Sequence, residues 1–401
     1  IWEINTVLAK RARVGHTGAM RRRDIERALS AVEALVRAGY DTASFAEQLA
    51  NLLQPVIPHA AACIVTIDPA TRLVTSTYKF GSLAGNHDLD TEWASIEYGT
   101  DDPTRMIAIA LEEVPARATS HLPGGTDDSV RIRTLIGPAG YHDELRMVAR
   151  CGDGLWGGVN LFRTTDQQCF DHDEVLVLAA LSEIVAEGLR IGLIARCAAS
   201  LDSEVPSGPA VLIVDSDANL QRVSAGSTEI FDELAVESNR SPMDSLVHGL
   251  AAAARQFAAG ESPLLPRARL RSPSGRWLVA HAAPLAAHDG VTDEVVITID
   301  EARPPEIMPL LASAFGLSSR EREVTQLVLG GSDTKGIASK LSMSAYTVQD
   351  HLKSIFDKAD VRSRRELVAR VFFDQYAPRF TDDVSPTGWY NATTPTTQPS
   401  G

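Results

Sequence analysis

The segment GSDTKGIASKLSMSAYTVQDHLKSIFDK, residues 331–358, determines the architecture near one end of the chain. Asp333 precedes TKGIASKL as a helix cap, and SMS at residues 342–344 forms a turn. A longer helix is predicted to start after Ser344. Two compact helices joined by a three-residue turn, the second with a polar outer face, indicate a helix-turn-helix.

The longer helix has two different faces when its residues are placed on a helical wheel. Its apolar face consists of Val348, Leu352, Ile355 and Phe356. Its opposite face consists of Tyr346, Gln349, Asp350, Lys353 and Asp357. We therefore expect the first set to pack inward and the second to point outward.

Two further helices are predicted on either side of this pair. SSREREVTQLVL has Ser318 and Glu321 in capping-box spacing and is followed by two glycines. SRRELVARVFF repeats the capping box with Ser363 and Glu366. These signals predict an all-α, four-helix domain over residues 306–378.

The combination of LSSREREV, GSDTKGIA and LSMSAYTVQDHLKSIFDKADVRSRRELVA resembles the LuxR/NarL family of DNA-binding domains nearly position by position, from Leu317 to Val371. The resemblance implies binding to double-stranded DNA as a homodimer, because the fourth helix of relatives forms the dimer contact and two half-sites follow. The sequence departs from the family at Gly336, usually acidic, and at Asp350, often small and apolar.

The resemblance also implies which side chains meet the DNA. The expected contacts with the backbone are Lys335, Thr347 and His351. The expected base-reading positions are Gln349, Asp350 and Lys353. The remaining expected contacts are Val348, half in the core and half in the groove, and the cations Arg362 and Arg364 at the start of the fourth helix.

Charge is distributed unevenly along the chain. The sequence has 38 Lys and Arg against 52 Asp and Glu, a net charge of -14. Residues 315–372 hold ten basic and seven acidic residues, a net of +3, so the remainder carries -17. Phosphate repels such an acidic protein as a whole, so any contact with DNA must be local and salt-sensitive.

The preceding part of the chain is long enough for further domains. In the unit over residues 20–199, an amphipathic helix at 42–57 is followed by a strand hairpin at 62–80, a polar middle and a second hairpin at 144–163. One long helix is predicted over 171–198. This order of elements resembles a GAF sensory domain, which implies an effector site between the sheet and the variable loops.

A second unit follows a Pro- and Gly-containing boundary and covers residues 207–302. GPAVLIVDSDANLQRVS and SGRWLVAHAAPL resemble a PAS-like domain. Short hairpin connections leave no room for βαβ crossovers, so both units are expected to be α+β with antiparallel sheets. The predicted fold is therefore multidomain, with GAF-like and PAS-like domains followed by the four-helix domain. Residues 1–19 are expected to be non-native or disordered, and residues 379–401 disordered.

Aromatic and polar side chains in or beside the variable loops of the GAF-like unit are the candidates for effector binding. They are Trp93, Tyr98, His121, Tyr141, His142 and Trp156. Each of them could equally be an ordinary core or surface residue.

Cysteine usage indicates reduced thiols. The four cysteines are Cys63, Cys151, Cys169 and Cys197, and none has the spacing of a zinc ligand, so no metal or other cofactor is expected. A redox thiol at Cys151, or haem ligation by His121 and His142, defines an alternative sensor that also binds DNA.

The sequence contains no nucleophile elbow, P-loop, HExxH or dinucleotide fingerprint, which indicates that the chain is not an enzyme. It has no apolar run that could span a membrane and no secretory signal, so a cytoplasmic location is expected. We interpret the chain as a transcription regulator whose small-molecule effector controls operator binding. The rival interpretation is control by a protein partner, such as a kinase or an RNA polymerase subunit, without a ligand.

Overall fold

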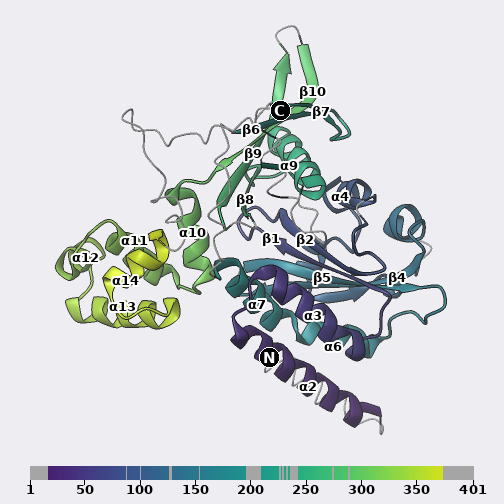
Figure 1. Ribbon diagram of the computed structural model, residues 1–401, viewed down its shortest axis with the longest axis horizontal. Coiled ribbons are helices and arrows are strands. Elements are labelled where there is room, and N and C mark those ends of the chain that lie inside the picture. Colours follow the sequence, from purple (N-terminus) through teal and green to yellow (C-terminus); the bar gives the residue numbers. More distant parts are fainter. Residues whose placement is uncertain are drawn as a thin grey trace, which may run out of the picture.

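The computed structural model describes residues 17–373 except 87, 100, 126–128, 153, 196–208, 225–226, 228–229, 232–233, 235–242, 273–274 and 288–289. Two β-sheets lie next to each other, and a lobe of helices stands beside them (Figure 1). The disorder expected at both ends falls outside the described residues, except that Thr17 to Ala19 already belong to the first described helix.

The first sheet has the strand order β2-β1-β5-β4-β3, and all of its neighbouring strands are antiparallel. Its strands are β1 (Ala61–Ile67), β2 (Val74–Gly81), β3 (Ala116–Ala118), β4 (Tyr141–Cys151) and β5 (Gly154–Thr164). Both predicted hairpins of the first unit are therefore confirmed. Strand β4 starts three residues before the predicted one, at Tyr141.

Helices cover both faces of this sheet. One face packs on α2 (Thr17–Ala38), α3 (Thr42–Val56), α6 (His172–Ala180) and α7 (Ser182–Ile194) (Figure 1). The other carries α4 (Asp90–Gly99), α5 (Met106–Ala110) and the π-helical turn η2 (Ile132–Ile136). The 3-10 turn η1 (Thr119–His121) directly follows the edge strand β3. The first contact is mainly hydrophobic, with one ion pair between Arg163 of β5 and Glu174 of α6, whereas the second face contains a buried cluster of charges.

The prediction of a single helix over 171–198 is wrong. The structure has two helices there, α6 and α7, which are separated at Leu181, and α7 ends at Ile194. No Pro or Gly stands at the break. The cause is a tertiary contact: the hydroxyl of Ser182 donates to the carbonyl of Val148 on β4 at 2.6 Å. Ser182 thus fastens the start of α7 to the sheet.

The second sheet repeats the plan of the first, in the order β7-β6-β10-β9-β8. Its strands are β6 (Ala210–Val214), β7 (Leu220–Val223), β8 (Arg267–Arg271), β9 (Trp277–Ala287) and β10 (Gly290–Glu301), and α9 (Met243–Ala258) packs on it. Numbered within its own unit, each sheet therefore has the order 2-1-5-4-3. The predicted pair of antiparallel sheets is confirmed.

The remaining helices form the lobe at the left of Figure 1. They are α11 (Ser319–Leu329), α12 (Thr334–Lys340), α13 (Ala345–Ala359), α14 (Arg364–Val368) and a π-helical end, η3 (Ala369–Phe373). All four predicted helices are confirmed. The sequence did not indicate α10 (Pro304–Ala314), which links the lobe to the sheets, because Pro304, Pro305 and Pro309 resemble turn signals. Pro304 and Pro305 occupy the first turn of α10. The backbone N–H groups there have no partner within the helix, so proline, which lacks this group, is tolerated.

Arginines of β8 fasten the second sheet domain to the first. Arg269 forms a bidentate ion pair with Asp68 in the β1–β2 turn. Its Nη2 donates to Oδ1 at 2.6 Å and its Nε donates to Oδ2 at 2.8 Å. Arg271 donates to the carbonyls of Leu193 and Ala195 at the end of α7, at 2.6 and 2.7 Å. The two sheet domains are thus joined by well-formed polar contacts.

Within the described part of the chain, no helix combines the length and the apolar character needed to cross a membrane.

Candidate DNA-binding surface and sensory interior

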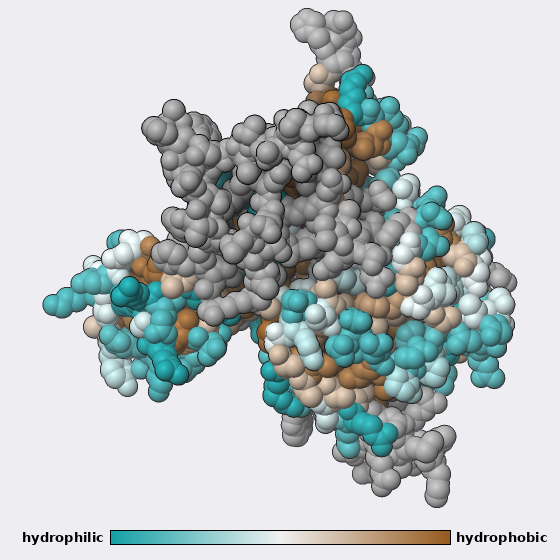
Figure 2. Space-filling view, in the orientation of Figure 1, coloured by the Kyte–Doolittle hydropathy of each residue, from teal (hydrophilic) through white to brown (hydrophobic). Residues whose placement is uncertain are grey.

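Helix α13 is held in place by its cap and its apolar face. The side chain of Ser344 accepts from the amide of Thr347 at 3.0 Å and caps the start of the helix. Val348, Leu352 and Ile355 are buried against the other helices of the lobe, as the helical wheel predicted. The polar face is exposed, and the side of this lobe seen in Figure 2 is mainly hydrophilic.

The residues expected to contact DNA differ in their exposure. Six of them are exposed: Lys335, Thr347, Gln349, Asp350, Lys353 and Arg362. His351 and Arg364 are half-buried. The exposed set comes from the start of α12, the first half of α13 and the turn before α14, so it lies on neighbouring elements of the lobe.

Two expected contacts have other partners in the structure. Val348 was expected half in the groove, but its exposed fraction is 0%, so its side chain serves the core alone. The guanidinium of Arg364 donates to the carbonyl of Ser332 and to the hydroxyl of Thr334, both at 2.9 Å. Arg364 therefore ties α14 to the start of α12.

Glu321 joins α11 to α13, a role that its capping-box spacing did not reveal. Its carboxylate accepts from Ser354 Oγ and Lys358 Nζ, each at 2.6 Å, and from the amide of Ser318, also at 2.6 Å. Desolvation opposes the charge, but these hydrogen bonds outweigh it and lower the pKa of Glu321 to about 2. The carboxylate is thus charged and fixes the orientation of α13.

Comparison with known proteins places this lobe in a family. A model described as bacterial regulatory proteins, luxR family, matches residues 316–371. Spore germination protein GerE of Bacillus subtilis (strain 168) is 38% identical over 55 residues, which are 14% of this chain and 74% of that protein. This chain belongs to the LuxR family of bacterial regulatory proteins.

Two longer relatives match segments of similar length. Transcriptional regulatory protein DesR of Bacillus subtilis (strain 168) is 40% identical over 67 residues, 16% of this chain and 34% of that protein. The monoamine regulon transcriptional regulator of Klebsiella aerogenes is 43% identical over 56 residues, 14% of this chain and 25% of that protein. The chain thus spans about a third or less of the length of these two relatives.

Solved structures give weaker likenesses. A crystal structure of the phage VqmA–DPO complex has a TM-score of 0.22 and 17% identity, and covers 45% of this chain and 88% of that chain. The E. coli DhaR(N)–DhaL complex has a TM-score of 0.21 and 15% identity, and covers 72% of this chain and 91% of that chain. These TM-scores are too low to transfer a fold or a ligand.

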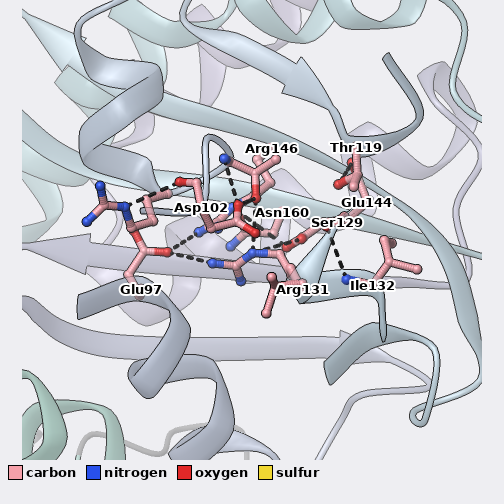
Figure 3. A network of polar contacts seen from close by, with 12 residues as sticks. Glu97, Asp102, Thr119, Ser129, Arg131, Ile132, Glu144, Arg146 and Asn160 are labelled. Carbon is pink, nitrogen blue, oxygen red and sulfur yellow. Dashed lines mark hydrogen bonds and ion pairs between the residues drawn. The ribbon is translucent and has the colours of Figure 1, made fainter. Parts of the chain in front are cut away.

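The first sheet domain of this LuxR-family chain contains a buried charge cluster, which consists of Glu97, Arg131, Glu144 and Arg146 (Figure 3). Glu97 Oε2 accepts from Arg131 Nη2 at 3.0 Å and from Arg146 Nη2 at 2.9 Å. Glu144 Oε2 lies 3.7 Å from Arg131 Nε, and its Oε1 lies 3.7 Å from Arg146 Nε. All four side chains are at most 5% exposed.

The cluster is incompletely hydrogen-bonded by the described residues. Both carboxylate oxygens of Glu144 and the Nη1 atoms of Arg131 and Arg146 are buried without a hydrogen-bond partner among the described residues. Burial raises the pKa of Glu144, against the opposing pull of Arg146 and Arg131. A further buried carboxylate close to the two arginines is Asp102, whose Oδ1 accepts from the amide of Thr104 at 2.8 Å.

Sequence reasoning missed this cluster, although β4 carried a signal for it. Leu145 and Met147 belong to the hydrophobic core beneath α3 and α7. Side chains alternate along a strand, so Glu144 and Arg146 must point to the opposite face. Two opposite charges on the inner face of a central strand indicate a buried ionic site.

A small pocket lies on the same face of the sheet as the charge cluster. Its walls include Trp93, Tyr141, Leu135 and the ion pair of Lys79 with Asp90. Its volume is about 50 Å³, whereas small-molecule sites commonly have about 300–1,000 Å³. Any effector larger than a few atoms must therefore displace part of this wall.

Of the six residues expected to bind an effector, only Trp93 and Tyr141 line this pocket. Tyr98 instead accepts from the amide of Val74 through its hydroxyl, and its carbonyl accepts from Gln256 of α9. It thus stands between the two sheet domains.

The other three expected effector residues lie elsewhere. His121 is exposed and hydrogen-bonds to the carbonyl of Phe170 at 2.9 Å. His142 hydrogen-bonds to the carbonyl of Arg163 at 3.1 Å. Trp156 is buried and borders a larger cavity next to α10. The six side chains therefore do not form one pocket.

The described cysteines have the character of protonated thiols. Burial raises the pKa of Cys63 to about 12, and it also raises the pKa of Cys151. A raised pKa lowers the fraction of reactive thiolate, which is the opposite of what a redox-sensing thiol needs. Cys197 lies outside the described residues. Among the residues that the structure describes, no three His, Cys, Asp or Glu side chains are grouped to hold a metal.

Proposed function

We propose that this chain is a transcription regulator that reads a DNA operator through the exposed face of α13. The observation that carries the proposal is the contrast across this helix, where Gln349, Asp350 and Lys353 are exposed and Val348 and Leu352 are buried. Gln pairs with adenine, Lys with guanine, and a carboxylate accepts from cytosine, so the exposed set can discriminate base pairs in a major groove.

The regulator acts as a dimer on two half-sites. LuxR-family membership and the geometry of helix-turn-helix dimers support this part of the proposal. The dimer contact would involve α14, which follows the recognition helix. The expected operator is therefore an inverted repeat whose half-sites are spaced by about one turn of DNA.

The first sheet domain senses a small molecule on the face that holds Trp93, Tyr141 and the charge cluster. Buried polar atoms without partners support a ligand or bound water there, since such groups are costly unless hydrogen-bonded. The shared strand order of the two sheets supports a pair of related sensory units, GAF-like and PAS-like. Effector binding would shift the population of arrangements in which two lobes fit paired half-sites.

In vitro selection with the full chain tests the DNA-binding part. Random duplexes are enriched on the protein, and the affinity for the enriched sequence is compared with that for a shuffled duplex by fluorescence anisotropy. We expect enrichment of an inverted repeat and tighter binding to it. Equal affinities for enriched and shuffled DNA at all salt concentrations would reject the proposed function.

A thermal-shift screen of metabolites on the full chain tests the sensory part. A compound that binds the first sheet domain should raise the melting temperature of the wild type and lose this effect in Trp93→Leu. The same compound must also change operator affinity. If every stabilising compound acts equally on Trp93→Leu, or leaves operator affinity unchanged, the sensory site is not where we propose it.

A further inference from the structure

A cavity of about 510 Å³ lies where the first sheet domain, α10 and α11 meet. Its walls come from all three parts: Trp156 and Arg190 from the first sheet domain, Met308 from α10, and Leu317, Arg322 and Gln326 from the LuxR-family lobe. This volume falls within the range of about 300–1,000 Å³ that is typical of small-molecule sites. It is also ten times that of the pocket beside Trp93.

Three arginines line this cavity, and they differ in how they are neutralised. Arg269 is paired with Asp68, as described above. Arg190 has only Glu187 near it, at 3.9 Å, and its buried Nε has no hydrogen-bond partner among the described residues. Arg322 has no described carboxylate within 4.0 Å, and it contacts only the hydroxyls of Ser313 and Ser319. Arg190 and Arg322 therefore carry charge that no described residue compensates closely.

A charged donor that is buried without a partner is unfavourable, so the arrangement favours a bound anion. The walls between the arginines are largely apolar, with Trp156, Met308 and Leu317 among them. Inorganic phosphate alone would leave these walls uncovered. A ligand that fits both features has an anionic group and an apolar body.

The cavity also lies at the junction between the first sheet domain and the DNA-binding lobe. The guanidinium of Arg190 packs against Gly316, where an added Cβ would come within 2.9 Å of Arg190 Nη1. Gly316 has a φ of +68° and is the first residue of the segment matched to the LuxR family. A ligand that draws Arg190 and Arg322 together therefore changes the contact between α7 and the start of the DNA-binding lobe.

We propose that this junction cavity binds a small organic anion, a carboxylate or phosphate with an apolar portion, between Arg190 and Arg322. The site is separate from the pocket beside Trp93, because it involves the opposite face of the sheet. Its ligand restrains the DNA-binding lobe relative to the sheet domains. The ligand would thus act directly on the contact between α7 and the DNA-binding lobe, without a conformational change inside the first sheet domain.

Calorimetric titration of the full chain tests this site with a defined panel: linear and aromatic carboxylates, the matching phosphate monoesters, their neutral amides, and inorganic phosphate. At least one organic anion should bind at millimolar concentration or below, whereas its neutral amide should not. Carboxylates and phosphates in parallel identify the preferred headgroup. Binding of inorganic phosphate alone, or of no member, overturns the proposal.

Variants locate the binding. Arg190→Gln and Arg322→Gln should each lower the affinity for the anion about tenfold or more, because each substitution removes a charge-assisted hydrogen bond. Arg190→Lys should restore part of the affinity, which a merely structural role would not produce. Arg37→Gln, whose side chain on α2 is 70% exposed, is the matched control and should bind as the wild type does. Equal losses in Arg37→Gln and Arg190→Gln would contradict the assignment, as would full affinity in both cavity variants.

These outcomes are independent of the sensory site in the first sheet domain. Trp93→Leu should leave the anion affinity unchanged. An anion lost in Trp93→Leu but retained in Arg190→Gln would place it beside Trp93 and reject the junction site.

Discussion

The first sheet domain and the DNA-binding lobe use charge in opposite ways. In the sheet domain, Glu97, Arg131, Glu144 and Arg146 are buried next to one another inside the fold. In the lobe, charged residues such as Lys335, Lys353 and Arg362 point outward to solvent. Removing an inner charge should therefore cost folding stability, whereas removing an outer charge should cost DNA binding and leave the fold unchanged.

The largest effect is expected when one inner cation is removed. Arg146→Met deletes a guanidinium that is 1% exposed and leaves Glu97 with one arginine fewer. Breaking a buried ionic cluster in this way costs about 3–5 kcal/mol of unfolding free energy. Urea unfolding followed by circular dichroism measures the loss.

Glu144→Gln is the matched control inside the same cluster. Because burial raises the pKa of Glu144 and favours its neutral form, an uncharged isostere should change stability far less than Arg146→Met does. A loss in Glu144→Gln as large as that in Arg146→Met would show that Glu144 is charged in the fold.

The same contrast explains what the sequence revealed. The lobe could be predicted because its caps and helix faces are local: Ser318, Asp333 and Ser344 each accept from an amide three residues later. The exposed polar face of α13 followed directly from the helical wheel.

The inner cluster could not be predicted as a site, because it depends on contacts between distant segments. Glu97 and Arg146 are 49 residues apart, and Asp68 and Arg269 are 201 apart. The break at Leu181 has the same origin, since it follows from the bond between Ser182 and β4. Only the alternation in β4 gave a local hint of buried charge.

The second largest effect is expected at Glu321. Among the described acidic residues of the lobe, it is the one whose side chain is buried. Glu321→Gln should destabilise the lobe by about 2 kcal/mol, a value reduced for the partial exposure of Lys358. Glu323→Gln is the matched control, because its side chain on the same helix is 46% exposed and pairs only with Arg320. Thermal unfolding of both variants and the wild type provides the comparison.

Acid should remove the difference between Glu321→Gln and the wild type. The pKa of Glu321 is lowered in the folded state from 4.5 to about 2. Its contribution is therefore complete above pH 4.5 and is lost as the pH falls towards 2. A difference in melting temperature that persists unchanged below pH 2 would mean that shape, and not charge, accounts for the effect.

Outer cations should affect DNA binding alone. Lys353→Ala should weaken binding to the enriched operator by about 1–3 kcal/mol while leaving binding to shuffled DNA nearly unchanged, because we propose that Lys353 reads a base. Lys335→Ala should weaken binding to both duplexes alike. It should also reduce the slope of log affinity against log salt concentration by about 0.9, because one phosphate charge is then no longer neutralised. Anisotropy titrations at several salt concentrations separate the two, and both variants should melt as the wild type does. The assignment fails if Lys353→Ala weakens both duplexes equally.

The smallest effect is expected at Asp350, where the outward face carries a negative charge. Asp350→Ala should raise the affinity for shuffled DNA by a small factor, because it removes repulsion between a carboxylate and phosphate. The preference for the enriched operator should fall at the same time, since the carboxylate can accept a hydrogen bond from a base amino group such as N4 of cytosine. Asp357→Ala, exposed on the same helix but beyond its base-reading half, is the matched control and should leave the preference unchanged. If both variants gain affinity equally and keep the preference, Asp350 only lowers attraction to phosphate. If the preference falls in Asp350→Ala alone, an acidic residue on the outward face takes part in selecting the operator.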